Sequence, residues 1–328
     1  MTYGSNISIC RRCILPSFPP YIELNEEGLC SLCRLSFKQK RQLLESDFVK
    51  IIKNYRKRDN KYDCFVMCSG GKDSTFALYC MKERYKMNPL AFTFDHGFLA
   101  PQALANIKNA INILGIDWLY LKTNEFLPLL KFALTQNKNI YICYLCSLWH
   151  MNLAFEVAKE KHIRLLIAGW TLYQSDLINL TSAYLPLSEP VYNFLRKYGK
   201  RFNLKYYNST VLKKKHRQIL VTSPLWYLNL DESEIKNIIR DKLGWKQTEE
   251  SYPAYSTNCQ LNYLSSYLAL KAFGYTHYHI EMSQMIREGK IGRQEAQKRL
   301  AFVKDSVEFD KIYDKIGLNR NERSALGY

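Results

Sequence analysis

The chain of 328 residues alternates short apolar runs with longer segments in which apolar side chains recur at helical spacing. Short apolar runs rich in β-branched and aromatic residues predict strands, and i, i+3, i+4 spacing predicts helices. The predicted strands cover residues 64–68, 90–94, 118–121 and 165–168. The predicted helices between and around them cover residues 73–84, 101–114, 125–134 and 148–161. This alternation predicts an α/β fold with a doubly wound parallel sheet, whose ligand crevice lies at the carboxyl ends of the strands.

The pattern changes on both sides of this region. A basic helical linker is predicted before the first strand, and a helical region is predicted to end the chain. Residues 172–220 have a looser pattern, which we interpret as a long insertion that carries active-site or partner-binding residues. The four predicted units are residues 1–36, 37–60, 61–230 and 231–328.

The segment from Cys68 to Thr75 reads CSGGKDST and links the first predicted strand to the first predicted helix. Glycines let backbone N–H groups approach an anion, hydroxyls add donors, and a helix N-terminus favours negative charge. The residues expected to bind phosphate are Ser69, Gly70, Gly71, Lys72, Ser74 and Thr75. Asp73 beside phosphate is expected to hold a metal ion. An ordinary glycine turn with a helix cap is the alternative.

The residues SGGKDS at 69–74 resemble the PP-loop of the ATP pyrophosphatases. They differ from the common mononucleotide loop, in which Ser or Thr directly follows the lysine. The resemblance implies an adenine-nucleotide α-hydrolase-like fold with ATP and Mg²⁺ as cofactors. It also implies that ATP adenylates a carbonyl or amide oxygen, releasing pyrophosphate and later AMP, with Lys72 and Asp73 as catalytic residues.

Asp95, His96 and Gly97 follow the second predicted strand. A residue at the carboxyl end of a parallel strand faces the ligand crevice, so Asp95 is expected to contact the adenosine part of ATP. A turn that only ends the strand is the alternative.

Four of the ten cysteines form two CxxC pairs near the N-terminus, separated by sixteen residues. This spacing is typical of a zinc ribbon with four thiolate ligands. The predicted zinc ligands are Cys10, Cys13, Cys30 and Cys33. Because four protein ligands leave no open position on zinc, a structural role is expected.

Cys143 and Cys146 form a third pair just before the helix predicted at 148–161, and Cys259 lies outside any strand pattern. Three cysteines can hold a [4Fe-4S] cluster and leave the fourth iron open. The alternatives are a second zinc with a histidine such as His150, a persulfide relay, and unliganded thiols. The trio resembles the cluster ligands of PP-loop tRNA thiolases, which also carry zinc ribbons.

Both ends of the chain resemble the N-acetyl sugar amidotransferase family of surface-polysaccharide synthesis. The matching segments are CRRCILP (10–16), EGLCSLC (27–33), LGW (243–245), KAFGY (271–275) and SQMIREGKIGRQEA (283–296). With the loop, the resemblance spans nearly the whole chain. The middle departs from it, because AGWT stands at 168–171 where the family has a Gly-Glu-Asn turn.

Three functional hypotheses follow. In the first, ammonia replaces the oxygen of an N-acetyl group on a free or nucleotide-linked sugar, and a separate glutaminase partner supplies the ammonia. In the second, sulfur passes through a cluster at the trio to a tRNA base or a small molecule. In the third, the protein is a non-catalytic zinc-ribbon RNA-binding module with a vestigial loop.

The net charge of +17 favours anionic partners such as nucleotides, sugar nucleotides or RNA. Residues 196–217 carry nine lysines and arginines and no acidic residue, interleaved with aromatic residues. This segment is either a nucleic-acid or polyphosphate groove or a solvated basic loop. No membrane span or secretory signal is evident, so we expect a cytoplasmic protein without a membrane partner. An oligomer is compatible with the sequence.

Overall fold

The computed structural model describes residues 8–34, 43–56, 60–177, 181–202, 204, 212, 214–248, 252, 258–303 and 305–327. Its centre is a five-stranded sheet in the order β3-β2-β1-β4-β5, and every neighbouring pair of strands is parallel. The strands are β1 (Cys64–Met67), β2 (Pro89–Asp95), β3 (Asp117–Lys122), β4 (Leu165–Ile167) and β5 (Leu220–Thr222). The doubly wound α/β fold predicted from the sequence is confirmed. The short strand β5 was not predicted.

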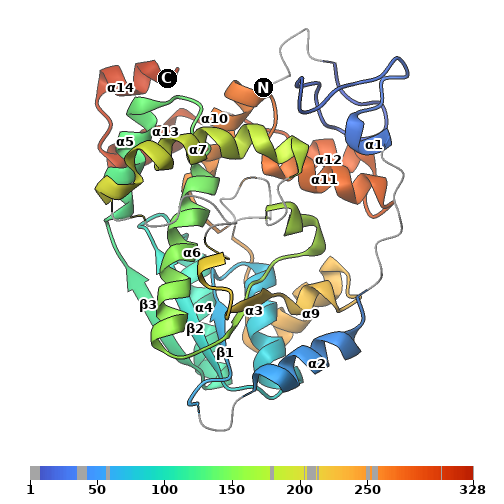
Figure 1. Ribbon diagram of the computed structural model, residues 1–328, viewed down its shortest axis with the longest axis vertical. Coiled ribbons are helices and arrows are strands. Elements are labelled where there is room, and N and C mark those ends of the chain that lie inside the picture. Colours follow the sequence, from blue (N-terminus) through green and yellow to red (C-terminus); the bar gives the residue numbers. More distant parts are fainter. Residues whose placement is uncertain are drawn as a thin grey trace.

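Helices cover both faces of the sheet (Figure 1). The helices packed on one face are α2 (Glu45–Tyr55), α3 (Lys72–Tyr79), α4 (Pro101–Leu114) and α9 (Glu232–Leu243). The other face is covered by α6 (Ile142–Glu160). In β1, Val66 faces the first set of helices and Phe65 faces α6. Because successive strand side chains point to opposite faces, this strand is apolar at every position.

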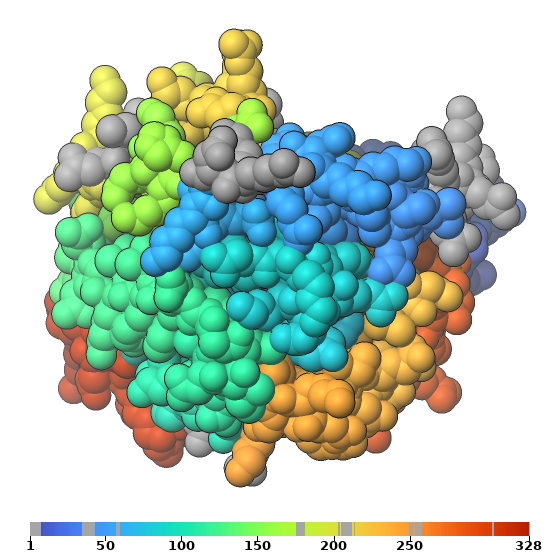
Figure 2. Space-filling model, turned by 90° about the horizontal axis from the view of Figure 1, so that it is seen from below, coloured from blue at the N-terminus to red at the C-terminus, as the bar shows by residue number. Residues whose placement is uncertain are grey.

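The C-terminal helices gather at one end of the molecule, drawn in orange and red in Figure 1. They are α10 (Leu261–Phe273), α11 (His277–Arg287), α12 (Arg293–Arg299), α13 (Ser306–Ile316) and α14 (Arg320–Ala325). Helices α10, α11 and α13 share one buried apolar cluster with α5 (Phe126–Gln136), α7 (Leu185–Tyr198) and the cysteine-rich N-terminal segment, whereas α12 packs with α11 in a smaller cluster. The end seen from below in Figure 2 is built mainly from the first half of the chain, in blue to green.

The segment predicted as a loose insertion contains a regular helix, α7. Its buried face carries Leu187, Val191 and Leu195 at a spacing of four residues. Two prolines obscure this pattern in the sequence. Pro186 lies in the first turn, where no backbone donor is needed, whereas Pro190 lies inside the helix.

Two further differences concern helix boundaries. The basic stretch before β1 forms α2, whose Phe48 and Ile52 are buried against the sheet, so this helix is part of the core. Helix α6 begins at Ile142, which places Cys143 and Cys146 inside its first two turns. Within the described part of the chain, no helix is long and apolar enough to cross a bilayer.

Helix α11 begins with a capping box in which histidine takes the place of the usual acid. The Thr276 hydroxyl accepts from the Tyr278 backbone N–H over 3.2 Å, and His279 Nδ1 accepts from the Thr276 backbone N–H over 3.2 Å. Burial lowers the pKa of His279 to about 3. The cap therefore depends on a neutral imidazole, because a protonated Nδ1 cannot accept a hydrogen bond.

This cap makes stability sensitive to acid. The ordinary pKa of histidine is 6.5, so between pH 6.5 and about 3 the unfolded chain binds the proton that folded His279 excludes. We expect the free energy of unfolding to fall by about 1.4 kcal/mol per pH unit below pH 6.5 through this group alone. His279→Gln keeps an acceptor at the cap and should flatten this dependence in urea unfolding between pH 7.5 and 5. His162→Gln, at an exposed position, should not; equal slopes for both variants would contradict this role of the cap.

Candidate functional site

A cavity of about 1580 Å³ lies at the carboxyl end of β1, between the sheet and the C-terminal helices. Five residues of the predicted phosphate loop line one wall: Ser69, Gly71, Lys72, Asp73 and Ser74. Side chains from α9, α11 and α12 also line it. The cavity therefore joins the loop to the region where the sequence resembles the C-terminal part of the amidotransferases.

Hydrogen bonds inside the loop give it a defined shape. The Ser69 backbone N–H donates to Ser74 Oγ over 3.2 Å, and Ser74 Oγ donates to the Gly71 carbonyl over 3.1 Å. The hydroxyls of Ser69 and Ser74 lie 3.0 Å apart. Gly71 is the N-cap of α3, so the first N–H groups of this helix face the same side as the two hydroxyls. This arrangement suits an anion at the N-terminus of α3.

Gly70 is held against neighbouring segments and requires a glycine. Its φ is +76°, and a Cβ added there would lie 2.1 Å from the Ala103 carbonyl oxygen. The Gly70 carbonyl accepts from Asn106 Nδ2 over 3.2 Å and from Trp245 Nε1 over 3.0 Å. Trp245 belongs to the LGW segment that resembles the amidotransferases, and its indole holds the loop in place.

A second close approach occurs where the loop after β4 crosses the start of α3. A Cβ on Gly169 would lie 2.4 Å from the Ser74 backbone nitrogen. No side chain fits between these two segments. The AGWT sequence thus preserves a glycine at the contact although it departs from the expected Gly-Glu-Asn turn.

Besides Gly70, two of the predicted nucleotide-binding residues lie outside the cavity wall. Thr75 is buried, and its backbone N–H donates to the Gly71 carbonyl over 3.0 Å. The Asp95 carboxylate is also buried, where it accepts from the Gly97 backbone N–H over 2.7 Å and from the Tyr120 hydroxyl over 2.5 Å. The first of these bonds belongs to the strand-ending turn, and the second comes from the neighbouring strand β3. A contact between Asp95 and adenosine stays a prediction.

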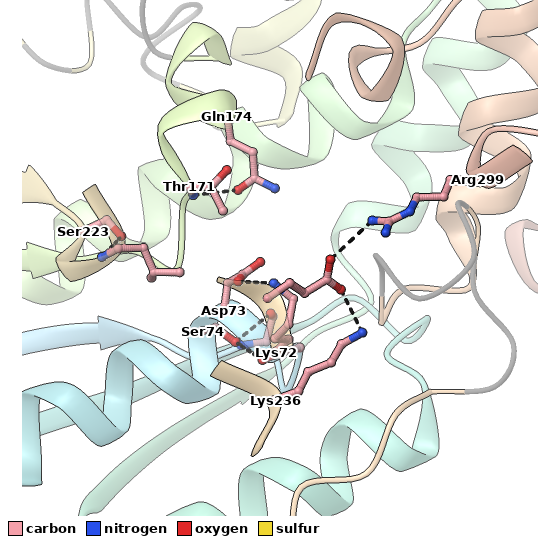
Figure 3. Close-up of polar contacts among 12 residues, drawn as sticks. Lys72, Asp73, Ser74, Thr171, Gln174, Ser223, Lys236 and Arg299 are labelled. Atoms are coloured by element: carbon pink, nitrogen blue, oxygen red, sulfur yellow. Dashed lines mark hydrogen bonds and ion pairs between the residues drawn. The ribbon is translucent and has the colours of Figure 1, made fainter. Parts of the chain in front are cut away.

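Charged side chains of both signs face the loop (Figure 3). Lys72 Nζ lies 2.5 Å from Asp73 Oδ1. The Glu232 carboxylate forms ion pairs with Lys236 Nζ at 2.8 Å and with Arg299 Nη1 at 3.3 Å. Burial lowers the pKa of Lys72, but the charge of Asp73 and their hydrogen bond outweigh it, so the pKa is raised. Lys72 therefore stays positively charged at neutral pH.

Glu281 on α11 was not predicted from the sequence. Burial and then the nearby charge of Asp73 raise its pKa to about 7, against the opposing effect of Lys72. Its side chain lines the cavity wall that lies across from the loop. A single glutamate on an amphipathic helix gives no sequence signal of this placement.

The four N-terminal cysteines fit a metal ion. Their sulfurs are buried and all lie within 4.8 Å of one another. Cys13 Sγ is 3.7 Å from Cys30 Sγ, and the Cys30 backbone N–H donates to Cys10 Sγ over 3.2 Å. Hydrogen bonds from Cys30 and Cys33 lower the pKa of Cys13, and the same contact raises the pKa of Cys30. Four thiols this close cannot all ionise without a cation, so the set is suited to zinc.

The cysteine-rich segment packs on the wall of the cavity. Ile14 is buried against Tyr278 and Met282 of α11, and both of these side chains also line the cavity. Arg293 Nη1 donates to the Arg11 carbonyl over 2.5 Å. Side chains of α11 therefore contact the cysteine-rich segment and also line the cavity.

The second cysteine group also faces the cavity, which the sequence alone did not establish. Cys143, Cys146 and Cys259 all line it. Burial raises the pKa of Cys143 to about 11, that of Cys259 to about 12 and that of Cys146 well above its usual value. Few of these thiols ionise at neutral pH on their own, which disfavours a persulfide relay without metal.

The donor set of this trio is compatible with a cluster. Among the residues that the structure describes, no set of three or more metal-binding side chains is as tightly gathered as the four N-terminal cysteines. Three soft sulfur donors that line one cavity, without all lying within 4.8 Å of one another, suit a group larger than a single ion. His150 Nδ1 lies 3.1 Å from the Cys146 carbonyl oxygen.

No protein-family model matches the chain. An uncharacterized protein of Methanocaldococcus jannaschii is 23% identical over 311 residues, which cover 94% of this chain and 97% of that protein.

The solved structures that are similar to this one at low identity include three enzymes. One is the U34-tRNA thiolase NcsA from Methanococcus maripaludis with its [4Fe-4S] cluster, at 17% identity over 88% of each chain with a TM-score of 0.40. Another is an NMN synthetase from Francisella tularensis, at 11% identity over 84% of this chain and 97% of that chain with a TM-score of 0.43. The third is an NH3-dependent NAD synthetase from Campylobacter jejuni, at 14% identity over 87% of this chain and 93% of that chain with a TM-score of 0.39. At this level of similarity the function has to be inferred from the residues of the chain itself.

The four-cysteine site leads to a prediction about zinc. Cys30→Ser should abolish the binding of one zinc per chain and lower the free energy of unfolding by about 3 kcal/mol or more, because metal binding contributes directly to folding. Zinc content and thermal unfolding measure the two effects. Cys80→Ala removes a buried cysteine from the apolar cluster between the sheet and α3. This variant should retain the zinc. Full zinc content in Cys30→Ser would rule out the four-thiolate site.

Proposed function

We propose that this protein uses ATP to adenylate a carbonyl or amide oxygen of a substrate and then replaces that oxygen with another atom. The observation that carries this proposal is the shape of the loop between β1 and α3. Its hydroxyls, its lysine and the N-terminus of a helix all face a cavity with room for a nucleotide and a second substrate.

The residues of the loop have distinct roles in the first step. Ser69, Ser74 and the first N–H groups of α3 bind the phosphates. The substrate oxygen attacks the α-phosphorus, the bond from that phosphorus to the bridging oxygen breaks, and pyrophosphate leaves. Lys72 neutralises the negative charge that develops on the bridging oxygen. Mg²⁺ bound through Asp73 would neutralise the pyrophosphate.

The resemblance of both chain ends to N-acetyl sugar amidotransferases supports nitrogen as the incoming atom. Ammonia would attack the carbon of the adenylated N-acetyl group, a proton would leave the nitrogen, and the carbon–oxygen bond would break to release AMP. The product would be an acetamidino sugar. In this version a separate glutaminase supplies the ammonia, and the sugar is free or nucleotide-linked.

The position of the three cavity thiols favours a second candidate, sulfur transfer. Cys143, Cys146 and Cys259 line the same cavity as the phosphate loop. A [4Fe-4S] cluster held by them would offer an open iron site for sulfide. The acceptor would be a tRNA base or a small molecule.

Arg201, which lies 4.6 Å over the Phe132 ring, belongs to the basic stretch that would contact RNA. Lys205 and Lys213 of this stretch lie outside the described residues.

The shared first step predicts a nucleotide-dependent activity that the loop controls. Asp73→Ala and Lys72→Ala should each lower ATP–pyrophosphate exchange or AMP release by about 100-fold or more, because each removes charge stabilisation from the transition state. Asp47→Ala and Lys50→Ala are matched controls, since this pair lies at the surface on α2. Wild-type activity in Asp73→Ala, or failure of the wild type to bind ATP with Mg²⁺, would overturn the proposal.

Metal analysis of protein purified without oxygen separates the two candidates. Sulfur transfer predicts about four irons per chain and a brown protein, in addition to one zinc. Cys146→Ser should then lose the iron and keep the zinc, whereas Cys33→Ser should lose the zinc. A colourless wild-type protein that holds zinc alone would leave nitrogen transfer as the supported reaction.

A further inference from the structure

The sulfur of Cys259 lies beside a buried histidine. His96 Nε2 is 3.7 Å from Cys259 Sγ, within hydrogen-bonding distance of sulfur. The Asn262 backbone N–H donates to the Cys259 carbonyl over 3.1 Å, which fixes the backbone of Cys259 at the start of α10. A thiolate accepts hydrogen bonds far better than a thiol does, so a donor at this place suits a sulfur that is a metal ligand.

Backbone pairing holds Cys259 beside the loop that carries His96. Leu99 and Cys259 form an antiparallel bridge, and the Gln260 backbone N–H donates to the Phe98 carbonyl over 2.9 Å. His96 stands at the start of the same loop, directly after β2. The contact between the imidazole and the sulfur therefore joins two segments that are already fixed to each other.

The orientation and the proton position of the imidazole are also fixed. The Phe98 backbone N–H donates to His96 Nδ1 over 3.3 Å, so this nitrogen carries no proton. A neutral imidazole then has its proton on Nε2, the nitrogen that faces Cys259. The rings of Phe94 and Phe126 pack around the imidazole, with centroids 5.7 and 5.5 Å away. With its side chain 7% exposed, His96 is kept out of water.

We propose that His96 is a positioning residue for Cys259, and that its Nε2–H group donates to the Cys259 sulfur while that sulfur serves as a thiolate ligand. The inference rests on the sulfur-transfer candidate and assigns His96 a place beside the cluster. With its proton on Nε2, His96 is a donor to the sulfur and is not itself a metal ligand. Hydrogen bonds to ligand sulfurs are one of the ways in which a protein sets the reduction potential of an iron–sulfur cluster.

The test is the reduction potential of protein reconstituted with iron and sulfide without oxygen. Removing a donor from a ligand sulfur leaves more electron density on the cluster, so His96→Phe should have a lower potential than the wild type. His96→Gln, which keeps an N–H donor, should recover part of the shift. His279→Gln removes a buried histidine that belongs to the cap of α11 and does not line the cavity, and should leave the potential unchanged.

The outcomes separate this inference from the function on which it rests. A wild type that binds no iron would overturn sulfur transfer and the role of His96 together, while ATP–pyrophosphate exchange would still report on the loop. If the wild type binds iron and His96→Phe keeps both its iron and its potential, the role of His96 alone is overturned. If His96→Phe fails to hold iron, its potential cannot be measured, and the iron content of His96→Gln decides instead. Retained iron in His96→Gln supports the role of His96 as a donor, and lost iron contradicts it.

Discussion

The site depends on the close approach of three segments at the N-terminus of α3. Gly70 lies against α4 and Gly169 lies against Ser74, and neither contact has room for a Cβ. These approaches hold the loop so that its hydroxyls and first N–H groups face one cavity. An anion-binding loop needs this fixed geometry, because donors that are already aimed need no reorganisation when the ligand arrives.

The opposite wall of the cavity depends on the cysteine-rich N-terminal segment. Ile14 of this segment and the cavity share Tyr278 and Met282 of α11. Zinc at the four cysteines would therefore support the wall that carries Glu281. The N-terminal segment is better described as part of the site's framework than as a separate binding module.

The two proposed reactions, nitrogen transfer and sulfur transfer, would use the same loop. They would differ in the residues that they use in the remainder of the cavity. Asn258 bonds to the Ser69 carbonyl, and the next residue, Cys259, lies among the cavity thiols. A single short segment thus connects the loop with the cavity thiols. In the proposed sulfur transfer, this segment would bring the sulfur ligands close to the adenylated substrate.

Local patterns in the sequence predicted four of the five strands, the loop between β1 and α3 and the four-cysteine group, because each depends on neighbouring residues. Strand and helix periods are local, the loop is one unbroken stretch, and the two CxxC pairs lie within one short segment. The contacts between distant residues follow from the way the chain folds in three dimensions. The bridge between Leu99 and Cys259 brings the third thiol to the first two, and α11 carries Glu281 to the loop. Such contacts join positions more than a hundred residues apart, and no local pattern encodes them.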